Sequence, residues 1–328
     1  MSGVELPREV YEIAEDIKTM RIRGAGRIAR AAARALKIAA EKYSGPDDPE
    51  AFVEYMEKAA HLLKSTRPTA VSLPNAVNYV MRVLRERRFD TVEAAIKAVI
   101  EQAERFIEYS MKATQRIGEI GSRLLQDGDR VLTHCNSSAA LSVIIEAWRR
   151  GKDLEVYATE TRPKFQGHIT VTKLSEAGLR PTLVPDSSVR YLMKRLDKVV
   201  VGADTVTANG AVINKIGTSQ IALAAKEHNV NFFVAAESIK FSPHTVIGEL
   251  VKIEERSPLE VVQKEYLERN PGIVVRNPAF DVTPPEYIDA IITELGVIPP
   301  QAAIMILVEE YKREIRDELL RATADIED

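Results

Sequence analysis

The stretch DKVVVGADTVTANGAVINKIGT, residues 197–218, predicts a buried strand that ends at a functional site. Its three valines lead into Gly202, Ala203 and Asp204, so a short apolar run ends on a carboxylate. An apolar run without alternation is typical of a strand that is buried on both faces. Ligands of open α/β sheets bind at the carboxyl ends of such strands. We therefore expect Asp204 to belong to a binding or catalytic site.

The second half of this stretch predicts a hairpin. Asn209-Gly210 is typical of a type I′ turn, which reverses the chain. The returning strand ends at Asn214 and Lys215. The hairpin therefore brings an amide and an ammonium group back toward the Asp204 carboxylate.

Composition limits the class of protein. A chain of 328 residues with 45% hydrophobic content can bury a large core, and its length favours two domains. The net charge of -3 argues against a dedicated nucleic-acid binder. The single cysteine excludes an internal disulfide and a cysteine-rich zinc site. No signal segment and no run of about 18 apolar residues is present, so we expect a cytoplasmic protein with no membrane partner.

The first 125 residues predict helices throughout. Apolar residues recur there at intervals of three and four, the helical spacing. The expected helices are Pro7–Ile22, Arg27–Tyr43, Glu50–Lys64, Asn75–Arg87 and Thr91–Leu125. We expect residues 1–125 to form an all-helical domain that contributes phosphate-binding segments.

Two segments of this helical part suit an anion. Gly24 and Gly26 separate two helices, and such a turn lets backbone N–H groups approach a phosphate that Arg23 can also bind. The alternative is a turn that packs two helices closely. Arg67 lies in TRPTAVSLPNA, residues 66–76, which two prolines predict to be extended. Here the alternative is that Arg67 caps a helix.

From residue 126 onward, strands alternate with helices. The expected strands are Arg130–Thr133, Leu154–Thr159, Pro181–Val184, the valine run before Gly202, and Phe232–Ala236. Helices are expected over Ala139–Arg150, Ile169–Ala177 and Thr218–Glu227. This alternation predicts an α/β fold: a Rossmann-like domain over residues 126–328 with a mostly parallel sheet. Residues 277–300 predict a proline-started helix, a short strand and a closing helix.

The turn HCNSS, residues 134–138, follows the first of these strands. Ser137 or Ser138 is expected to cap the next helix. A thiol near a helix N-terminus can have a lowered pKa, so Cys135 can act as a base or nucleophile. The alternative is that Cys135 is a small buried hydrophobe. His134 is expected to be structural, because adjacent residues of a strand face opposite ways.

Seven motifs stand in order along the chain: RGAG (23–26), RPTAV (67–71), HCN (134–136), ETRPKFQG (160–167), GAD (202–204), NGAVINKIGT (209–218) and NPAFDVTPPEYIDAIITE (277–294). Together they resemble the superfamily of sugar-1-phosphate isomerases related to eukaryotic initiation factor 2B. The resemblance implies that Cys135 and Asp204 form a catalytic pair. The initiation-factor subunits generally do not keep both residues, so the pair favours an enzyme.

Within the superfamily, the closer resemblance is to the archaeal-type ribose-1,5-bisphosphate isomerases, which form ribulose 1,5-bisphosphate in nucleoside monophosphate degradation. Methylthioribose-1-phosphate isomerases usually have a glycine-containing turn after the cysteine and lack a lysine at the position of Lys240. A lysine suits a second phosphate better than a methylthio group. The substrate-binding residues implied by the resemblance are Arg23, Gly24, Ala25, Gly26, Arg27, Arg67, Ser137, Ser138, Ala139, Gln166, Asn214, Lys215 and Lys240.

The resemblance also implies the chemistry. A protonated Asp204 donates to the ring oxygen as the ring opens, and the Cys135 thiolate removes the C2 proton. The resulting cis-phosphoenolate is protonated at C1; a hydride shift from C2 to C1 is the alternative. No metal or other cofactor is expected. A nucleoside monophosphate such as AMP is a plausible activator, and a dimer-based homo-oligomer, a hexamer, is expected. The alternative functions are methylthioribose-1-phosphate isomerase and a non-catalytic regulatory subunit.

Overall fold

The computed structural model describes residues 4–67, 70–248, 251–312 and 315. It contains two compact units, Met1–Ala113 and Thr114–Asp328, and we describe each by itself. The division falls inside helix α5 (Val92–Gly121), whereas the sequence places a domain boundary near residue 125. The first unit is all-helical and the second contains a mostly parallel sheet, so the predicted fold class is confirmed. Among the described residues, no helix is long and apolar enough to cross a membrane.

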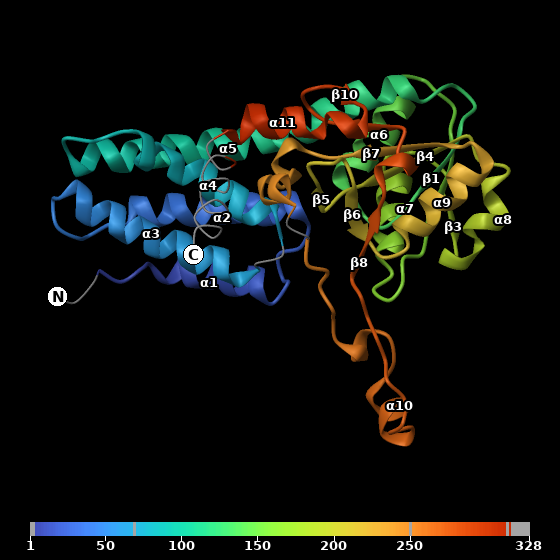
Figure 1. Ribbon diagram of the computed structural model, residues 1–328, viewed down its shortest axis with the longest axis horizontal. Helices are drawn as coiled ribbons and strands as arrows, with labels where there is room; N and C mark the ends of the chain where they lie inside the picture. Colours follow the sequence, from blue (N-terminus) through green and yellow to red (C-terminus); the bar gives the residue numbers. More distant parts are fainter. Residues whose placement is uncertain (1–3, 68–69, 249–250, 313–314, 316–328) are drawn as a thin grey trace. The chain divides into compact units, whose positions relative to one another are not determined.

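The first unit contains four helices and the first part of α5: α1 (Arg8–Lys18), α2 (Ala25–Glu41), α3 (Pro49–Thr66) and α4 (Ser72–Glu86) (Figure 1). Small side chains let α2 pack closely, since Ala29, Ala32 and Ala33 are fully buried. Helix α4 begins inside the segment that was predicted to be extended. Pro74 is tolerated there because N–H groups in the first turn of a helix need no intrahelical partner.

The second unit contains a seven-stranded sheet in the order β10-β9-β7-β4-β1-β2-β3. Its strands are β1 (Arg130–Thr133), β2 (Glu155–Thr159), β3 (Thr182–Val184), β4 (Lys198–Gly202), β7 (Asn231–Ala235), β9 (Ala290–Ile292) and β10 (Val297–Ile298). All neighbouring strands are parallel except β10, which is antiparallel to β9. The five strands predicted from the sequence are present, shifted by at most one residue. The strand order reverses direction between β1 and β4.

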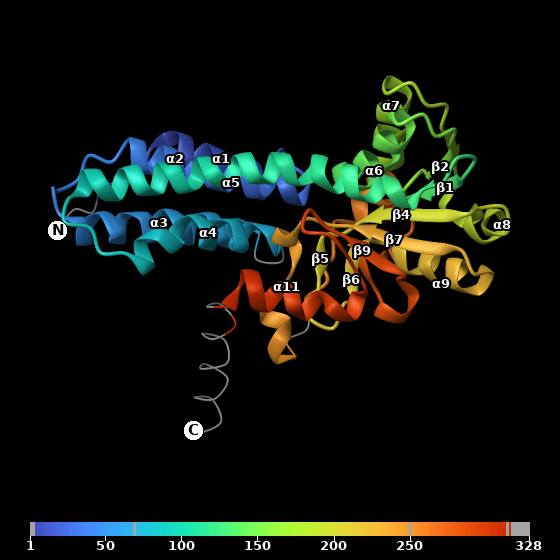
Figure 2. The same cartoon turned by 90° about the horizontal axis from the view of Figure 1, so that it is seen from above.

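Helices cover both faces of this sheet, as a buried parallel strand requires (Figure 2). The helices are α6 (Ser138–Arg149), α7 (Gln166–Glu176), α8 (Val189–Met193), α9 (Thr218–His228) and α11 (Ala303–Glu310). Figure 2 shows α6 and α7 on one side of the sheet and α9 and α11 on the other. The valines of β4 alternate between two cores: Val199 and Val201 join α8, α9 and α11, while Val200 joins α6. The prediction of a strand buried on both faces is confirmed.

The predicted hairpin is present, but its turn differs. Strands β5 (Thr205–Val206) and β6 (Val212–Lys215) are antiparallel, and β8 (Phe280–Thr283) adds a third strand. Gly210 has a positive φ of 83° whereas Asn209 does not, so the turn is not type I′. The prediction of a proline-started helix within residues 277–300 was wrong. Strand β8 precedes the prolines, and they begin only a single 3-10 turn, Pro285–Tyr287. The predicted short strand and closing helix correspond to β9 (Ala290–Ile292) and α11 (Ala303–Glu310).

The remaining elements are short. Helix α10 spans Lys264–Arg269, and other 3-10 turns span Ser122–Leu124, Asp186–Ser188, Ser238–Lys240, Pro243–Ile247, Pro258–Glu260 and Pro300–Ala302.

Gly167→Ala should destabilise the second unit. A Cβ at Gly167 would lie 1.7 Å from the carbonyl oxygen of Thr159 in β2, so the start of α7 would have to move away from the strand. We expect a loss of about 1–3 kcal/mol in the free energy of unfolding, measured by chemical denaturation. Gly272→Ala is the control, because a Cβ there meets nothing within 4 Å. Equal unfolding midpoints for the two variants would contradict this close approach.

Candidate functional site

The candidate site lies where the strand order of the sheet reverses. Cys135 follows β1 and Asp204 follows β4, and these two strands are parallel neighbours. The loops after two such strands leave the sheet in opposite directions and open a crevice between them, which is where α/β proteins bind ligands. The two residues of the predicted catalytic pair therefore lie at the same edge of the sheet, in adjacent loops.

The backbone of Cys135 is in an unusual conformation. Its φ is +64°, a left-handed value that costs a non-glycine residue about 1–3 kcal/mol. Two threonines hold this peptide: the Cys135 N–H donates to Thr161 Oγ1 at 2.9 Å, and Thr170 Oγ1 donates to the Cys135 carbonyl at 2.6 Å. Reasoning from the sequence missed both threonines. Only the presence of Thr161 in the motif at 160–167 pointed toward this loop.

Asp186, at the end of β3, holds the loop that carries Thr161. Its carboxylate accepts the N–H groups of Thr161 at 2.8 Å and Arg162 at 2.7 Å. The chain of contacts from Asp186 through Thr161 to Cys135 links three loops at the sheet edge. Asp186 thus fixes the cysteine indirectly.

His134 is structural, as predicted. Its ring is buried, with Nε2 3.0 Å from the Ile216 carbonyl oxygen and Nδ1 2.5 Å from Thr159 Oγ1. A carbonyl can only accept, so Nε2 carries the proton and Nδ1 accepts from the threonine hydroxyl. Burial lowers the pKa of His134 to about 4, which keeps the ring neutral at physiological pH.

The expectation of a lowered thiol pKa was wrong for this structure. Burial raises the pKa of Cys135 to about 11, and the Asp204 carboxylate adds to this effect. The positive charges of Lys215 and Arg256 oppose it. Ser137 caps α6 by accepting the N–H of Ala140, so the helix begins after the cysteine and its N-terminus does not outweigh burial.

Asn214 and Lys215 lie at the end of β6, where both side chains are buried. The Asn214 amide donates to Thr218 Oγ1 at 3.1 Å. Lys215 Nζ donates to the Ala279 carbonyl at 3.0 Å. Burial lowers the pKa of Lys215, and Arg256 lowers it further, whereas Cys135 and Asp204 raise it. The hairpin therefore brings the Lys215 ammonium group close enough to Cys135 and Asp204 to interact with them electrostatically, as the sequence indicated.

Asp281 is a second carboxylate at this edge. It lies on β8 opposite Asn214, and it accepts the N–H groups of Gly217 at 2.7 Å and Ser219 at 3.2 Å. It thereby binds the N-terminus of α9. Burial raises its pKa to about 6, although these N–H groups and Lys215 act in the opposite direction. Asp281 joins β6, β8 and α9 around Lys215.

Lys240 pairs with a carboxylate of its own chain. Its side chain is only 8% exposed, and Nζ lies 3.1 Å from Glu237 Oε2. Glu237 Oε1 in turn accepts from Thr114 Oγ1 at 3.1 Å. A phosphate bound by Lys240 must therefore share the ammonium group with Glu237.

The other predicted residues of the second unit lie near the start of helices. Ser138 is exposed at the start of α6, Ala139 is buried behind it, and Gln166 is the first residue of α7 and partly buried. Gly202 is needed for close packing, because a Cβ there would lie 2.3 Å from Ser137 Oγ. This contact brings the end of β4 against the cap of α6.

In the helical unit, the predicted residues gather at the start of α2. Gly24 has a φ of +88° and precedes the helix, which begins with Ala25, Gly26 and Arg27. The side chains of Arg23 and Arg27 are exposed, and Arg23 Nε donates to the Met20 carbonyl at 2.7 Å.

Ser72 Oγ donates to the Ala25 carbonyl at 3.1 Å, so the start of α4 lies against the start of α2. Arg67 is partly buried and ends α3, which is the capping position considered as its alternative role. Pro68 and Thr69 of the RPTAV motif lie outside the described residues.

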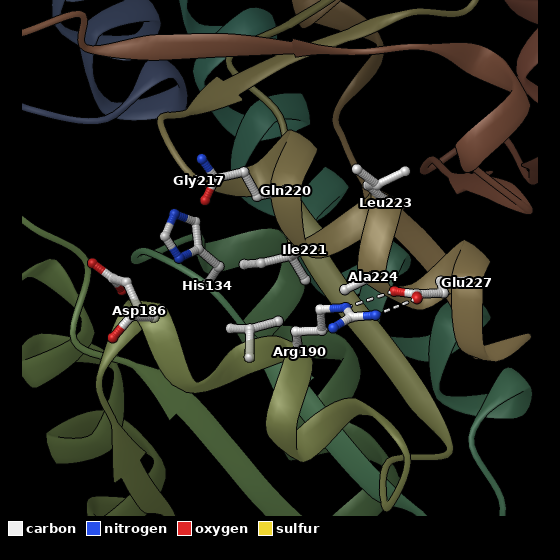
Figure 3. Close-up of a pocket in the computed structure, with 11 residues that line it drawn as sticks. His134, Asp186, Arg190, Gly217, Gln220, Ile221, Leu223, Ala224 and Glu227 are labelled. Carbon is white, nitrogen blue, oxygen red and sulfur yellow. Dashed lines mark hydrogen bonds and ion pairs between the residues drawn. The ribbon is translucent and has the colours of Figure 1, made fainter.

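A separate pocket of about 290 Å³ lies beside α8 and α9 (Figure 3). Its 11 lining residues include His134 and Gly217 but none of the predicted catalytic or substrate-binding residues. Two of the lining residues, Arg190 and Glu227, form a bidentate ion pair. Elsewhere in the described part of the chain, no group of three or more His, Cys, Asp or Glu side chains is arranged to hold a metal ion.

Comparison with known proteins gives close relatives along almost the whole chain. Ribose 1,5-bisphosphate isomerase of Archaeoglobus fulgidus is 58% identical, with 92% of this chain and 93% of the relative covered. The protein of the same name from Pyrococcus furiosus is 55% identical, with 94% and 96% covered. The methylthioribose-1-phosphate isomerase of Acetivibrio thermocellus is 41% identical, with 90% of each chain covered. The resemblance found in the motifs is confirmed.

Solved structures show the same fold. The translation initiation factor eIF-2B of Pyrococcus horikoshii OT3 has a TM-score of 0.77 at 30% identity, covering 91% of this chain and 100% of its own. The 5-methylthioribose 1-phosphate isomerase of the same organism has a TM-score of 0.76 at 34% identity, covering 92% and 87%. Residues 21–300 match the Initiation factor 2 subunit family. The chain therefore belongs to the Initiation factor 2 subunit family.

Proposed function

We propose that this protein is an isomerase that converts ribose 1,5-bisphosphate to ribulose 1,5-bisphosphate. The observation that carries the proposal is the position of Cys135 and Asp204 at the switch point of the sheet, with the Lys215 ammonium among their charged neighbours. Relatives of 54–58% identity that bear this enzyme's name support the choice of substrate.

The reaction needs an acid and a base on one sugar. A phosphate on C1 prevents spontaneous opening of the ring, so Asp204 donates a proton to the ring oxygen as the ring C–O bond breaks. Cys135 then removes the proton from C2, and the electron pair forms the C1–C2 double bond of a phosphoenolate. Protonation at C1 and loss of the enol proton give the ketose. Two groups in adjacent loops suit this sequence, because C2 and the ring oxygen are close together in a furanose.

The base has to lose its proton before it can act. Burial of Cys135 opposes this loss, whereas Lys215 and Arg256 favour it. The cost of forming the thiolate therefore depends on these two cations. They also stabilise the enolate, which carries negative charge in the same place.

The remaining residues supply binding in this proposal. In the helical unit, taken by itself, the backbone N–H groups at the start of α2, with Arg23 and Arg67, suit an anion, because a helix N-terminus and a guanidinium both favour anions. In the second unit, Ser137, at the cap of α6, and Lys240 suit the C5 phosphate.

The main alternative is methylthioribose-1-phosphate isomerase. The ion pair between Lys240 and Glu237 favours it, because a lysine already neutralised by a carboxylate is less specific for a second phosphate. A non-catalytic regulatory role is the other alternative, and it predicts that Cys135 and Asp204 are dispensable. A nucleoside monophosphate activator, a hexamer built from dimers and a cytoplasmic location remain predictions of the family resemblance.

Cys135→Ser should lower turnover of ribose 1,5-bisphosphate about a thousandfold while the protein stays folded, since general-base catalysis contributes about 10²–10⁴-fold. Alkylation of the unaltered protein by iodoacetamide tests the role of the same thiol, because Cys135 is the single cysteine of the chain. With a thiol pKa of about 11, the rate of reaction with iodoacetamide should rise about tenfold per pH unit between pH 7 and 10. Full activity after complete alkylation would contradict the role of Cys135.

Asp204→Asn should retain substrate binding but lose about 10²–10⁴-fold in turnover, because an amide keeps the shape of the side chain without a transferable proton. Binding is measured by calorimetry and turnover by detection of the ketose. The exposed carboxylate of Asp90 provides the control, and Asp90→Asn should behave as the unaltered protein. If Asp204→Asn stays active, Asp281 becomes the acid to test.

Lys240 decides the class of substrate. Lys240→Met alone leaves Glu237 buried without its ion-pair partner, so the informative variant is Lys240→Met with Glu237→Gln. If Lys240 binds the C5 phosphate, this pair of changes should raise the KM for ribose 1,5-bisphosphate about tenfold or more. The KM for methylthioribose 1-phosphate should change far less.

A matched control is available on the surface of α5. Lys112→Met with Glu108→Gln removes the same kind of ion pair from side chains that are 72% and 66% exposed. It should leave both KM values unchanged. Equal losses on the two substrates for the Lys240 and Glu237 variant would remove the argument for a C5 phosphate at this lysine.

A further inference from the structure

Two cations flank the ring of Phe280 at the edge of the candidate site. Lys215 Nζ lies 4.9 Å from the ring centroid and Arg256 Cζ lies 5.4 Å from it. Lys215 and Phe280 are register partners on β6 and β8. The backbone of Arg256 is held beside them, because its backbone N–H donates to the Asn277 carbonyl at 2.9 Å. The aromatic ring attracts both positive charges through its electron-rich faces.

The two cations lie in poorly hydrated surroundings. The Lys215 residue is 5% exposed and the Arg256 side chain is 14% exposed, so neither charge is well hydrated. Two like charges in such surroundings repel each other, and Arg256 accordingly lowers the pKa of Lys215. Glu254 offsets part of this charge through its contact with Arg256 Nε at 2.9 Å.

The guanidinium group is positioned for a further ligand. Its Nε is occupied by Glu254, whereas its two Nη groups donate no hydrogen bond to any residue that the structure describes. A guanidinium presents these donors as a planar fork that fits two oxygens of a phosphate. The guanidinium lies over the ring of Phe280, as does the Lys215 ammonium group. The family resemblance implies that Lys215 binds substrate.

We propose that Arg256 is a substrate-binding residue which, together with Lys215, binds the phosphate on C1 of the sugar. The assignment rests on the proposed function. Cys135 acts at C2 in that reaction, so the C1 phosphate lies one carbon from the atom that loses its proton. A cation pair among the charged neighbours of Cys135 therefore suits the C1 phosphate and the enolate formed beside it. No motif in the sequence pointed to Arg256.

Turnover provides the first test. Arg256→Gln should lower kcat/KM for ribose 1,5-bisphosphate about tenfold or more, and Arg256→Lys should recover only part of this loss because it restores the charge without the fork. Arg276→Gln is the matched control, since Arg276 lies in the same segment, pairs with Glu255 and is 77% exposed. Equal kcat/KM values for Arg256→Gln and the control would overturn the proposal.

Protection of the single thiol provides a test that does not depend on turnover. Inorganic phosphate should slow the alkylation of Cys135 by iodoacetamide in the unaltered protein and in Arg276→Gln, and this protection should be lost in Arg256→Gln. Unchanged protection in a folded Arg256→Gln protein, with its fold checked by circular dichroism, would also overturn the proposal. If the unaltered protein fails to isomerise ribose 1,5-bisphosphate, the proposed function fails, while the protection experiment still decides whether Arg256 binds phosphate.

Discussion

The parallel pairing of β1 with β4 is the constraint on which the candidate site depends. β1 and β4 are distant in sequence, and the sheet extends in opposite directions from their junction. The following loops therefore diverge and leave a crevice at the carboxyl ends of the strands. Cys135 and Asp204 occupy these two loops, and Gly202 lets the end of β4 approach the Ser137 cap. The packing of the central strands thus determines the position of both predicted catalytic groups.

Burial of polar and charged groups is the second feature of this edge. Lys215 is buried and Asp281 is partly buried, and each is compensated by backbone groups: a carbonyl for the ammonium and N–H groups for the carboxylate. Such compensation offsets part of the desolvation cost without neutralising the charge. The Lys215 ammonium, held in place but incompletely hydrated, is thereby suited to attract an anionic ligand. Burial also raises the pKa of the Cys135 thiol, whereas Lys215 and Arg256 lower it. The two cations that suit the site to an anion therefore also favour the thiolate that would act as the base.

The fold alone does not separate proteins named as isomerases from those named as initiation factors. Structures of an initiation factor and of a methylthioribose-1-phosphate isomerase match this chain with almost equal TM-scores, 0.77 and 0.76. A difference in activity between proteins of the same fold has to come from the side chains at the functional site, here at the switch point of the sheet. Cys135, Asp204 and the cations around them are the features of this chain that favour an enzyme.

The sequence by itself determined the helical and α/β parts, five strands of the sheet, and the strand ends that carry Cys135 and Asp204. Local patterns suffice for these features, because apolar spacing and turn residues act within a few positions of the chain. It missed β8 and predicted the wrong type for the Asn209-Gly210 turn. A strand such as Phe280–Thr283 is defined by its pairing with β6, which local sequence does not show. Only the tertiary structure decided the raised pKa of the thiol and the meeting of Lys215, Phe280 and Arg256. These properties depend on burial and on residues brought together from separate segments, and no local spacing in the sequence records them.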